Sequence, residues 1–134
     1  MGYLKIVDGG GSRGVTVLVV EDDEAMAAVL QAWLRVDPRF VHVDQVATVA
    51  AAREWMARDS PDIVVLDYAL PDGTAADVLE ALGELDTHPA TVLHTSHADF
   101  AELGERLGCQ AAVHKGDWAG LADQLLTLAS GVAR

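Results

Sequence analysis

The sequence is short of basic residues and of cysteine, and both shortages limit what the protein can do. Its 134 residues include 9 Lys and Arg against 21 Asp and Glu, which gives a formal net charge of −12. Contacts to nucleic-acid phosphates need clustered Lys and Arg, so we expect no direct nucleic-acid binding. The single cysteine, Cys109, excludes an internal disulfide and suits a reducing compartment.

Long apolar runs are missing as well. No uninterrupted apolar stretch approaches the ~20 residues that a membrane-spanning helix needs, and the chain shows no signal peptide. We therefore expect a cytoplasmic protein with no membrane partner. Hydrophobic residues nevertheless make up 51% of the sequence, which is enough to build the core of one domain.

Residues 1–14 differ in composition from the rest of the chain. Residues 8–14 (DGGGSRG) are typical of a flexible linker. Gly9, Gly11 and Gly14 satisfy the G-x-G-x-x-G pattern of dinucleotide sites. Such a site needs the loop to open a helix, whereas the residues that follow predict a strand, so we reject a nucleotide site here. We expect residues 1–14 to be a Gly-rich extension and residues 15–134 to be a single domain.

Four short apolar runs each end on a polar side chain. They are VTVLVV, DIVVL, ATVLH and CQAAVH, which are followed by Glu21-Asp22, Asp67, Thr95 and Lys115, respectively. Three of the runs are rich in β-branched residues, as expected for strands buried on both faces of a parallel sheet. Because ligands bind outside the carboxyl ends of such strands, we expect three carboxylates, a hydroxyl and an ammonium at one edge.

The segments between these runs have helical periodicity, so the chain reads as alternating strands and helices. A further strand is predicted over residues 40–46. Helices are predicted to begin near Asp23, after Thr48, after Thr74, near Ala98 and near Asp117. The tryptophans and methionines fall on the apolar faces of these helices, and we expect them to pack in the core. The pattern predicts an α/β fold with a doubly wound parallel sheet.

Three clustered carboxylates are costly unless a cation offsets them, because two unit charges ~4 Å apart interact by about 4 kcal/mol at an effective dielectric constant of about 20. Magnesium fits, since it binds one or two carboxylates and keeps waters that phosphate oxygens can replace. The alternative is that residues 21–24 only cap the first helix. That alternative leaves Asp67, on a different strand, unexplained.

These residue types suit phosphoryl transfer. A carboxylate such as Asp67 can act as a nucleophile and form an acyl phosphate. Lys115 could neutralise one phosphoryl oxygen and the Thr95 hydroxyl could donate a hydrogen bond to another, while the loop over residues 68–73 turns a backbone carbonyl toward the metal. Taken singly, Thr95 could be an ordinary strand-end residue and Lys115 a solvated one. The combination in chain order favours the phosphoryl site.

The segments VLVVEDDE, IVVLDYALPDG, VLHTS and VHKG resemble the motifs of response-regulator receiver domains of two-component signalling systems. The resemblance extends over about residues 15–131. It implies a flavodoxin-like doubly wound (βα)5 sandwich with a five-stranded parallel sheet in the order 2-1-3-4-5. It also implies a phosphoryl-accepting switch in a phosphorelay. The implied partners are a sensor histidine kinase or phosphotransfer protein, and a downstream protein target or an output domain outside this sequence.

The resemblance assigns a role to each site residue, with Mg²⁺ or Mn²⁺ as the cofactor. The phospho-acceptor is Asp67. The metal ligands are Asp22, Asp67 and the backbone carbonyl of Ala69, with Glu21 acting through water. The phosphoryl group is contacted by Thr95 and Lys115. Two positions that modulate attack of water on the phosphoryl group in the family are Ala69 and His97.

The sequence departs from the family at two positions near Lys115. The family often has Tyr or Phe three residues before the lysine and Pro after it, where this chain has Ala112 and Gly116. The usual aromatic switch therefore cannot operate at position 112, and Ala112 is a third candidate modulator of the site beside Ala69 and His97. His94 and His114 precede Thr95 and Lys115. They either contact each other beneath the site or are packed independently.

Two other functions compete with the signalling switch. The missing aromatic suggests a receiver-like scaffold that acts through protein contacts without phosphate. A phosphatase with an aspartyl-phosphate intermediate commonly has a second Asp two residues after the nucleophile, but this chain has Ala69 there. We therefore do not expect the protein to be an enzyme that turns over an external substrate. The expected output surface is the fourth helix, fifth strand and fifth helix, with Asp99, Glu102, Glu105 and Asp117 on it.

Overall fold

A computed structural model describes residues 14–132, and its centre is a five-stranded parallel sheet. The strands are β1 (Val15–Val20), β2 (Phe40–Val46), β3 (Ile63–Leu66), β6 (Ala90–Thr95) and β7 (Ala111–His114). Their order across the sheet is β2-β1-β3-β6-β7, and every neighbouring pair is parallel. Counted along the chain, this order is 2-1-3-4-5, so the predicted flavodoxin-like fold is confirmed.

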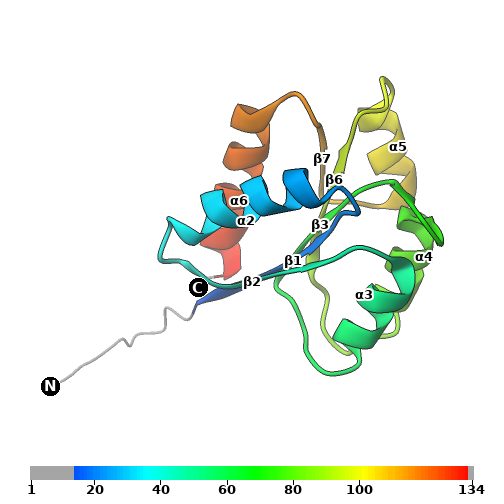
Figure 1. The fold of residues 1–134 in the computed structure, drawn as a ribbon, viewed down its shortest axis with the longest axis horizontal. Coiled ribbons are helices and arrows are strands. Elements are labelled where there is room, and N and C mark those ends of the chain that lie inside the picture. The colour runs from blue at the N-terminus through cyan, green and yellow to red at the C-terminus, as the bar shows by residue number, and fades with distance from the viewer. Residues whose placement is uncertain (1–13, 133–134) are drawn as a thin grey trace, which may run out of the picture.

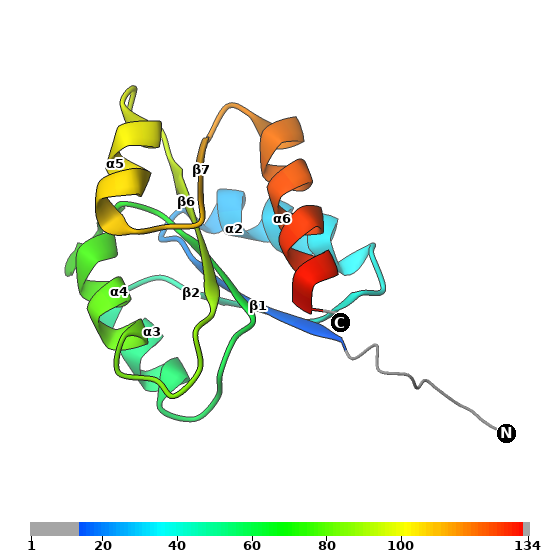
Figure 2. The ribbon, with the colours of Figure 1, turned by 180° about the vertical axis from the view of Figure 1, so that it is seen from behind.

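Helices cover both faces of the sheet (Figures 1 and 2). One face carries α2 (Glu24–Arg35) and α6 (Trp118–Val132), and the other carries α3 (Val49–Met56), α4 (Ala75–Leu82) and α5 (Phe100–Leu107). Alternate side chains of each strand feed two hydrophobic clusters, one under each helical layer. Both faces of the sheet are therefore buried, which explains the nearly continuous apolar runs in the sequence.

The predicted helix starts are confirmed where a polar side chain caps the helix. The Asp23 carboxylate accepts a hydrogen bond from Met26 N at the start of α2, and the Thr48 hydroxyl accepts one from Ala51 N at the start of α3. Thr74 caps α4 and forms a capping box with Asp77. These bonds satisfy backbone N–H groups that would have no partner within the helix.

A two-stranded hairpin follows Asp67, and we did not predict it. It pairs β4 (Ala69–Leu70) with β5 (Gly73–Thr74) in antiparallel register. The Asp72 carboxylate at its turn accepts hydrogen bonds from Val49 N (2.7 Å) and Ala50 N (3.0 Å). These backbone bonds hold the pKa of Asp72 below its usual range. They also tie the loop after Asp67 to the start of α3.

The expectation that all tryptophans pack in the core is wrong for two of them. Trp55 is buried, but 36% of Trp33 and 37% of Trp118 is exposed. The side of α2 that faces the sheet buries Ala27, Leu30 and Leu34, and Trp33 lies beside that stripe. The exposed rings therefore belong to a surface shared by α2 and α6.

Helix α5 lies unusually close to β7 at Gly104. A Cβ atom built on Gly104 would lie 2.6 Å from the Cβ of Ala112, which is closer than two carbons can approach. We expect Gly104→Ala to lower the free energy of unfolding by about 1 kcal/mol or more, because the overpacking cost exceeds the gain in helix propensity. Chemical denaturation measures the difference.

Gly131 in α6 is the matched control for Gly104. A Cβ atom built there meets nothing within 4 Å. Gly131→Ala should leave the free energy of unfolding unchanged or raise it by up to about 1 kcal/mol. Equal effects of the two substitutions would show that the close approach of α5 to β7 does not limit residue size.

Within residues 14–132, no helix is long and apolar enough to cross a membrane. The predicted Gly-rich extension, residues 1–14, lies outside the described residues except for Gly14. Its boundary with the domain therefore stays a prediction.

Candidate functional site

The topology brings the predicted site residues to one edge of the sheet. Strands β1 and β3 are neighbours in register through Val20 and Leu66, so Glu21 and Asp67 follow them side by side. Asp67 N donates to Val20 O (3.0 Å), which extends this ladder into the site. The neighbouring β6 and β7 place Thr95 and Lys115 at the same edge.

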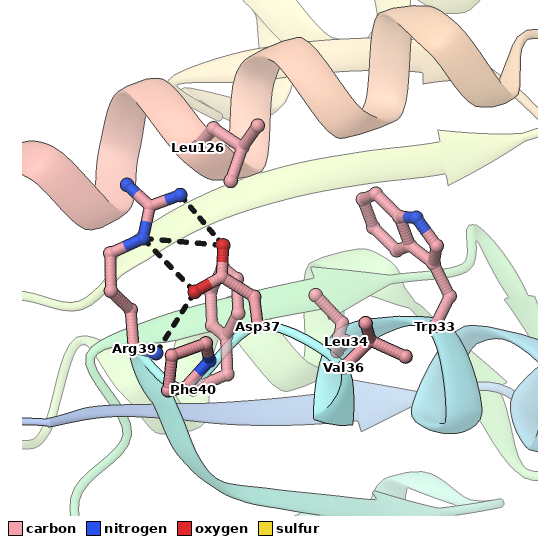
Figure 3. Close-up of a pocket in the computed structure, with 8 residues that line it drawn as sticks. Trp33, Leu34, Val36, Asp37, Arg39, Phe40 and Leu126 are labelled. Atoms are coloured by element: carbon pink, nitrogen blue, oxygen red, sulfur yellow. Dashed lines mark hydrogen bonds and ion pairs between the residues drawn. The ribbon is translucent and has the colours of Figure 1, made fainter.

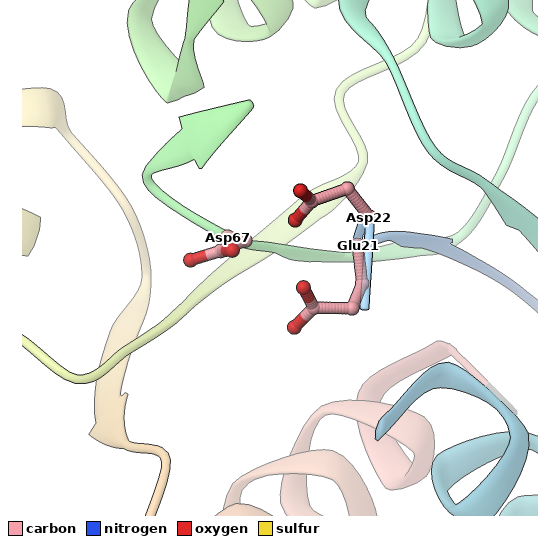
Figure 4. Close-up of side chains that lie close together, drawn as sticks. All are labelled: Glu21, Asp22 and Asp67. Carbon is pink, nitrogen blue, oxygen red and sulfur yellow. The ribbon is translucent and has the colours of Figure 1, made fainter. Parts of the chain in front are cut away.

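Three carboxylates gather beyond β1 and β3 (Figure 4). Glu21, Asp22 and Asp67 each offer an oxygen atom, and these atoms lie within 4.8 Å of one another. Glu21 and Asp67 are buried, with 3% and 8% of the whole residue exposed, while Asp22 is exposed. Two of the three charges are thus withdrawn from water, which makes their mutual repulsion expensive.

Lys115 supplies part of the compensating charge. Its Nζ atom lies 2.8 Å from Glu21 Oε1 and 3.1 Å from Asp67 Oδ2. With all groups ionised, three carboxylates and one ammonium leave a net charge of −2 at the site. A divalent cation would neutralise that remainder, and carboxylate oxygens are the ligands that Mg²⁺ prefers. The donor set therefore fits the expected metal.

Burial and ion pairing oppose each other at this cluster. Burial raises the pKa of Glu21 despite the hydrogen bond from Lys115, which lowers it. Burial alone would lower the pKa of Lys115, but its hydrogen bonds to Glu21 and Asp67 outweigh that effect and raise the pKa above its usual value. The lysine is consequently held in its protonated form.

Backbone groups fix the orientation of the two buried carboxylates. Tyr68 N donates to Asp67 Oδ1 at 2.8 Å, so one oxygen of Asp67 is held by the main chain and the other by Lys115. Asp23 N donates to Glu21 Oε2 at 3.2 Å. The sequence did not reveal Gln45, whose side chain donates to the carbonyl of Glu21 at 2.8 Å. The cluster is therefore held in place by the ends of the strands.

The Thr95 hydroxyl lies at the same edge and is buried, with 2% of the residue exposed. Its Oγ1 accepts a hydrogen bond from His97 N at 3.4 Å. The hydroxyl hydrogen is not used in this bond, so Thr95 can still donate it to another group. Lys115 N donates to Thr95 O at 2.9 Å, which fixes the spacing of the hydroxyl and the lysine. A hydroxyl donor and an ammonium at the same edge of the sheet as Asp67 can bind the oxygens of an anion.

Two of the predicted modulators lie at the rim of the site, and the third lies under α5. Ala69 is exposed on β4. The ring of His97 meets Tyr68 edge-on at 5.1 Å, and its Nδ1 lies 3.9 Å from Asp99 Oδ1. Ala112 faces Gly104 of α5. Tyr68, which follows Asp67, was not predicted as a neighbour of His97.

His94 and His114 pack independently of each other. The ring of His94 meets Trp118 of α6 at 5.9 Å, whereas the ring of His114 meets Phe100 of α5 at 5.8 Å. His94 pairs in register with Val113, so the two histidines point to opposite faces of the sheet. Of the alternatives left open by the sequence, independent packing is the one that the structure shows.

The buried His94 predicts a loss of stability in acid. Burial lowers the pKa of His94 from 6.5 to about 4, aided by the charge of Lys115, and its Nε2 has no hydrogen-bond partner. In the unfolded chain the imidazole takes up a proton at its ordinary pKa, while in the folded chain it stays neutral. We therefore expect protonation of His94 in the unfolded chain to lower the free energy of unfolding by about 2 kcal/mol as the pH falls from about 7.5 to 5.

Urea unfolding of wild type and His94→Leu at both pH values measures this term. The leucine variant has an apolar side chain at position 94 and keeps all other titrating groups. Between the two pH values, its free energy of unfolding should therefore fall by about 2 kcal/mol less than that of wild type. Equal losses in the two proteins would show that His94 is not held neutral by burial.

The chain is similar to known proteins in both sequence and structure. Residues 17–116 match the family model for the response regulator receiver domain. The chain is 30% identical over 127 residues, 92% of its length, to a protein-glutamate methylesterase/protein-glutamine glutaminase of Gluconobacter oxydans, of which the match spans 36%. Among such curated relatives the chain spans between 20% and 42% of their length.

Solved structures show the same fold. A two-component response regulator of the LuxR family from Aurantimonas superposes with a TM-score of 0.77 at 21% identity, covering 89% of this chain and 87% of that one. The response regulator TrrA from Thermotoga maritima, solved in complex with Mg²⁺-BeF, gives a TM-score of 0.74 at 17% identity and covers 85% of this chain and 98% of that one.

Proposed function

This chain belongs to the response regulator receiver domain family, and we propose that it is a phosphoryl-accepting switch of a two-component phosphorelay with Asp67 as the acceptor. The observation that carries the proposal is the convergence of Glu21, Asp22, Asp67 and Lys115 at one edge of the sheet. An acidic cluster paired with a single lysine suits a metal ion and a phosphoryl group together.

The carboxylates of Asp22 and Asp67 would hold Mg²⁺ or Mn²⁺, with the Ala69 carbonyl as a further ligand and Glu21 acting through water. When bound, the metal supplies positive charge between the carboxylates and the phosphoryl oxygens. It would also cancel the net charge of −2 that Lys115 leaves at the site. Lys115 would then no longer have to offset the charges of both Glu21 and Asp67, so its ammonium group could turn toward a phosphoryl oxygen.

In the proposed reaction, an oxygen of Asp67 attacks the phosphorus of a phosphohistidine or of a small phosphodonor. The new bond is an acyl phosphate, and the bond from phosphorus to the donor atom breaks, with its electron pair leaving on the donor. Lys115 neutralises one phosphoryl oxygen and the Thr95 hydroxyl donates a hydrogen bond to another. Tyr68 N holds the second oxygen of Asp67, so only one oxygen is presented for attack.

Two apolar grooves meet at Trp33 and support a docking face for the phosphodonor protein. A groove of about 470 Å³ between α2 and α6 is lined by Val29, Trp33 and Trp118. A second groove, of about 620 Å³, continues past Trp33 to Val36 and Phe40 (Figure 3). Helix α2 begins just after the acidic cluster and α6 just after Lys115. A histidine kinase helix seated in the groove between α2 and α6 would lie toward the edge that carries Asp67, whereas the second groove extends toward the opposite edge, where β2 begins.

Val29→Asp tests this docking face. Val29 is 55% exposed, so the substitution should leave folding intact but place a charge in the apolar groove. We expect phosphoryl transfer from a histidine kinase that modifies the wild type to fall by about 10-fold or more, while modification by a small phosphodonor stays unchanged. Val41→Asp on β2, where the valine is 53% exposed, is the matched control. Equal losses in both variants would argue against the face.

The output surface is proposed where the sequence placed it, on α5, β7 and the start of α6. Asp99, Glu102, Glu105 and Asp117 are exposed there. A downstream protein or an attached output domain with basic residues would complement this surface. The proposal includes no turnover of an external substrate.

Incubation of the protein with Mg²⁺ and acetyl phosphate, followed by intact mass measurement, tests the proposed function. We expect the mass of one phosphoryl group to be added, and chelation of the metal to prevent the addition. A wild-type protein that gains no phosphoryl group with Mg²⁺ from acetyl phosphate or from any kinase would favour the receiver-like scaffold that acts without phosphorylation.

A further inference from the structure

Thr95 and His114 are direct partners across two neighbouring strands. They are the last residues of β6 and β7, and they pair in parallel register. The pair two residues earlier, Leu93 and Ala112, packs in the core under α3, α4 and α5. Because side chains alternate along a strand, Thr95 and His114 point to that same face. The imidazole therefore lies on the same face of the sheet as the hydroxyl of the proposed phosphoryl site, on the neighbouring strand.

The His114 ring is held between a backbone donor and an aromatic ring. Gly116 N donates to His114 Nδ1 at 3.0 Å, and the ring meets that of Phe100 at a centroid distance of 5.8 Å and an angle of 63°. Phe100 is the first residue of α5, which lies along β6 and β7 (Figure 1). Strand pairing thus links Thr95 to His114, and a ring contact links His114 to the start of α5.

This arrangement accounts for both departures from the family near Lys115. A large side chain at Ala112 would collide with α5, because Gly104 packs directly on it. A proline at position 116 would have no N–H to donate to His114. A Cβ atom at Gly116 would also lie 3.2 Å from His114 Nδ1, closer than most such contacts. Small residues at positions 104, 112 and 116 thus accommodate His114, the strand partner of Thr95, against Phe100.

We propose that His114 and Phe100 transmit the state of Asp67 to α5. When the Thr95 hydroxyl moves to bond a phosphoryl oxygen, the space it leaves changes the packing of the His114 ring, and Phe100 carries that change to the first turn of α5. This inference rests on the proposed function. It names the residues through which phosphorylation alters the acidic output surface, which includes Asp99, Glu102 and Glu105 of the same segment.

Amide NMR spectra of the Mg²⁺-loaded protein, recorded with and without beryllium fluoride as the phosphoryl mimic, test the route. In wild type we expect shifts at residues 67–70 and also at residues 99–105. In His114→Ala the shifts at residues 67–70 should persist, while those at residues 99–105 should fall by about half or more. Phosphorylation of Asp67 by acetyl phosphate should be retained. His42→Ala, an exposed histidine on β2, is the matched control.

Two further variants keep the test decisive if His114→Ala folds poorly. Phe100→Leu keeps an apolar side chain but removes the ring, and should also uncouple α5. His114→Phe keeps a ring against Phe100 and should preserve the α5 shifts. If α5 responds fully in both His114→Ala and Phe100→Leu, the route is overturned while the switch stands. If wild type shows no change at residues 67–70, the proposed function falls, and the route with it.

Discussion

Replacing Asp67 with Asn should abolish acyl-phosphate formation, with a loss of about 100-fold or more in the fraction modified by acetyl phosphate and Mg²⁺. The asparagine amide has nearly the same shape as the carboxylate but is not a nucleophile. Its carbonyl oxygen can still accept the hydrogen bond from Tyr68 N, which holds Asp67 Oδ1 at 2.8 Å, so the backbone should keep its position. Intact mass measurement after a fixed incubation gives the fraction modified.

Asp86→Asn is the matched control for this substitution. Asp86 is exposed and lies in the segment between α4 and β6, away from the carboxyl ends of the strands. Its variant should take up the phosphoryl group as wild type does. Equal modification of wild type and Asp67→Asn would mean that the phosphoryl group enters at another residue, and the assignment of the acceptor would be wrong.

Replacing Lys115 with Met should destabilise the protein and make it more dependent on metal. The side chains of Glu21 and Asp67 are only 5% and 11% exposed, and removing Lys115 leaves both carboxylates without their shared partner. We expect the free energy of unfolding to fall by about 3 kcal/mol in metal-free buffer. Because Mg²⁺ would replace the missing charge, its stabilising effect should be larger in the variant than in wild type. Thermal and urea unfolding with and without Mg²⁺ measure both effects.

Arg53→Met provides the comparison for Lys115. Arg53 pairs with Glu80 at 3.3 Å, but 42% and 74% of these two side chains are exposed. An exposed pair contributes little, so this variant should lose less than about 1 kcal/mol and should not respond to Mg²⁺ differently from wild type. If Lys115→Met behaves like Arg53→Met, the lysine does not offset the buried carboxylates.

Much of the fold could be predicted because local rules and packing agree. The strand over residues 40–46 was predicted with the bounds that the structure shows. Thr48 and Thr74 each start a helix as expected, since their hydroxyls accept hydrogen bonds from backbone groups that helix geometry leaves unpaired. The meeting of Asp67 with Glu21 followed from strand order alone, because parallel neighbours end at the same edge.

Other features depend on tertiary packing that periodicity does not specify. Helical spacing defines an apolar stripe on α2 but does not show which part of it faces the sheet, and so Trp33 was wrongly placed in the core. The hairpin after Asp67 is only two residues on each strand, too short to leave a sequence pattern. The contact of His114 with Phe100 joins β7 to α5, and the close approach of these two elements depends on Gly104. In the sequence alone, a glycine within a helix indicates only a lower helix propensity.

We propose that Asp22, Asp67, Thr95 and Lys115 act together on one metal ion and one phosphoryl group. A crystal structure of the wild-type protein with Mg²⁺ and beryllium fluoride would show whether they do. We expect the fluoroberyllate on Asp67, the metal against the carboxylates of Asp22 and Asp67, and Lys115 moved from Glu21 to a fluorine atom. A fluoroberyllate bound elsewhere, or a metal that leaves Asp22 and Asp67 uncoordinated, would contradict this proposal.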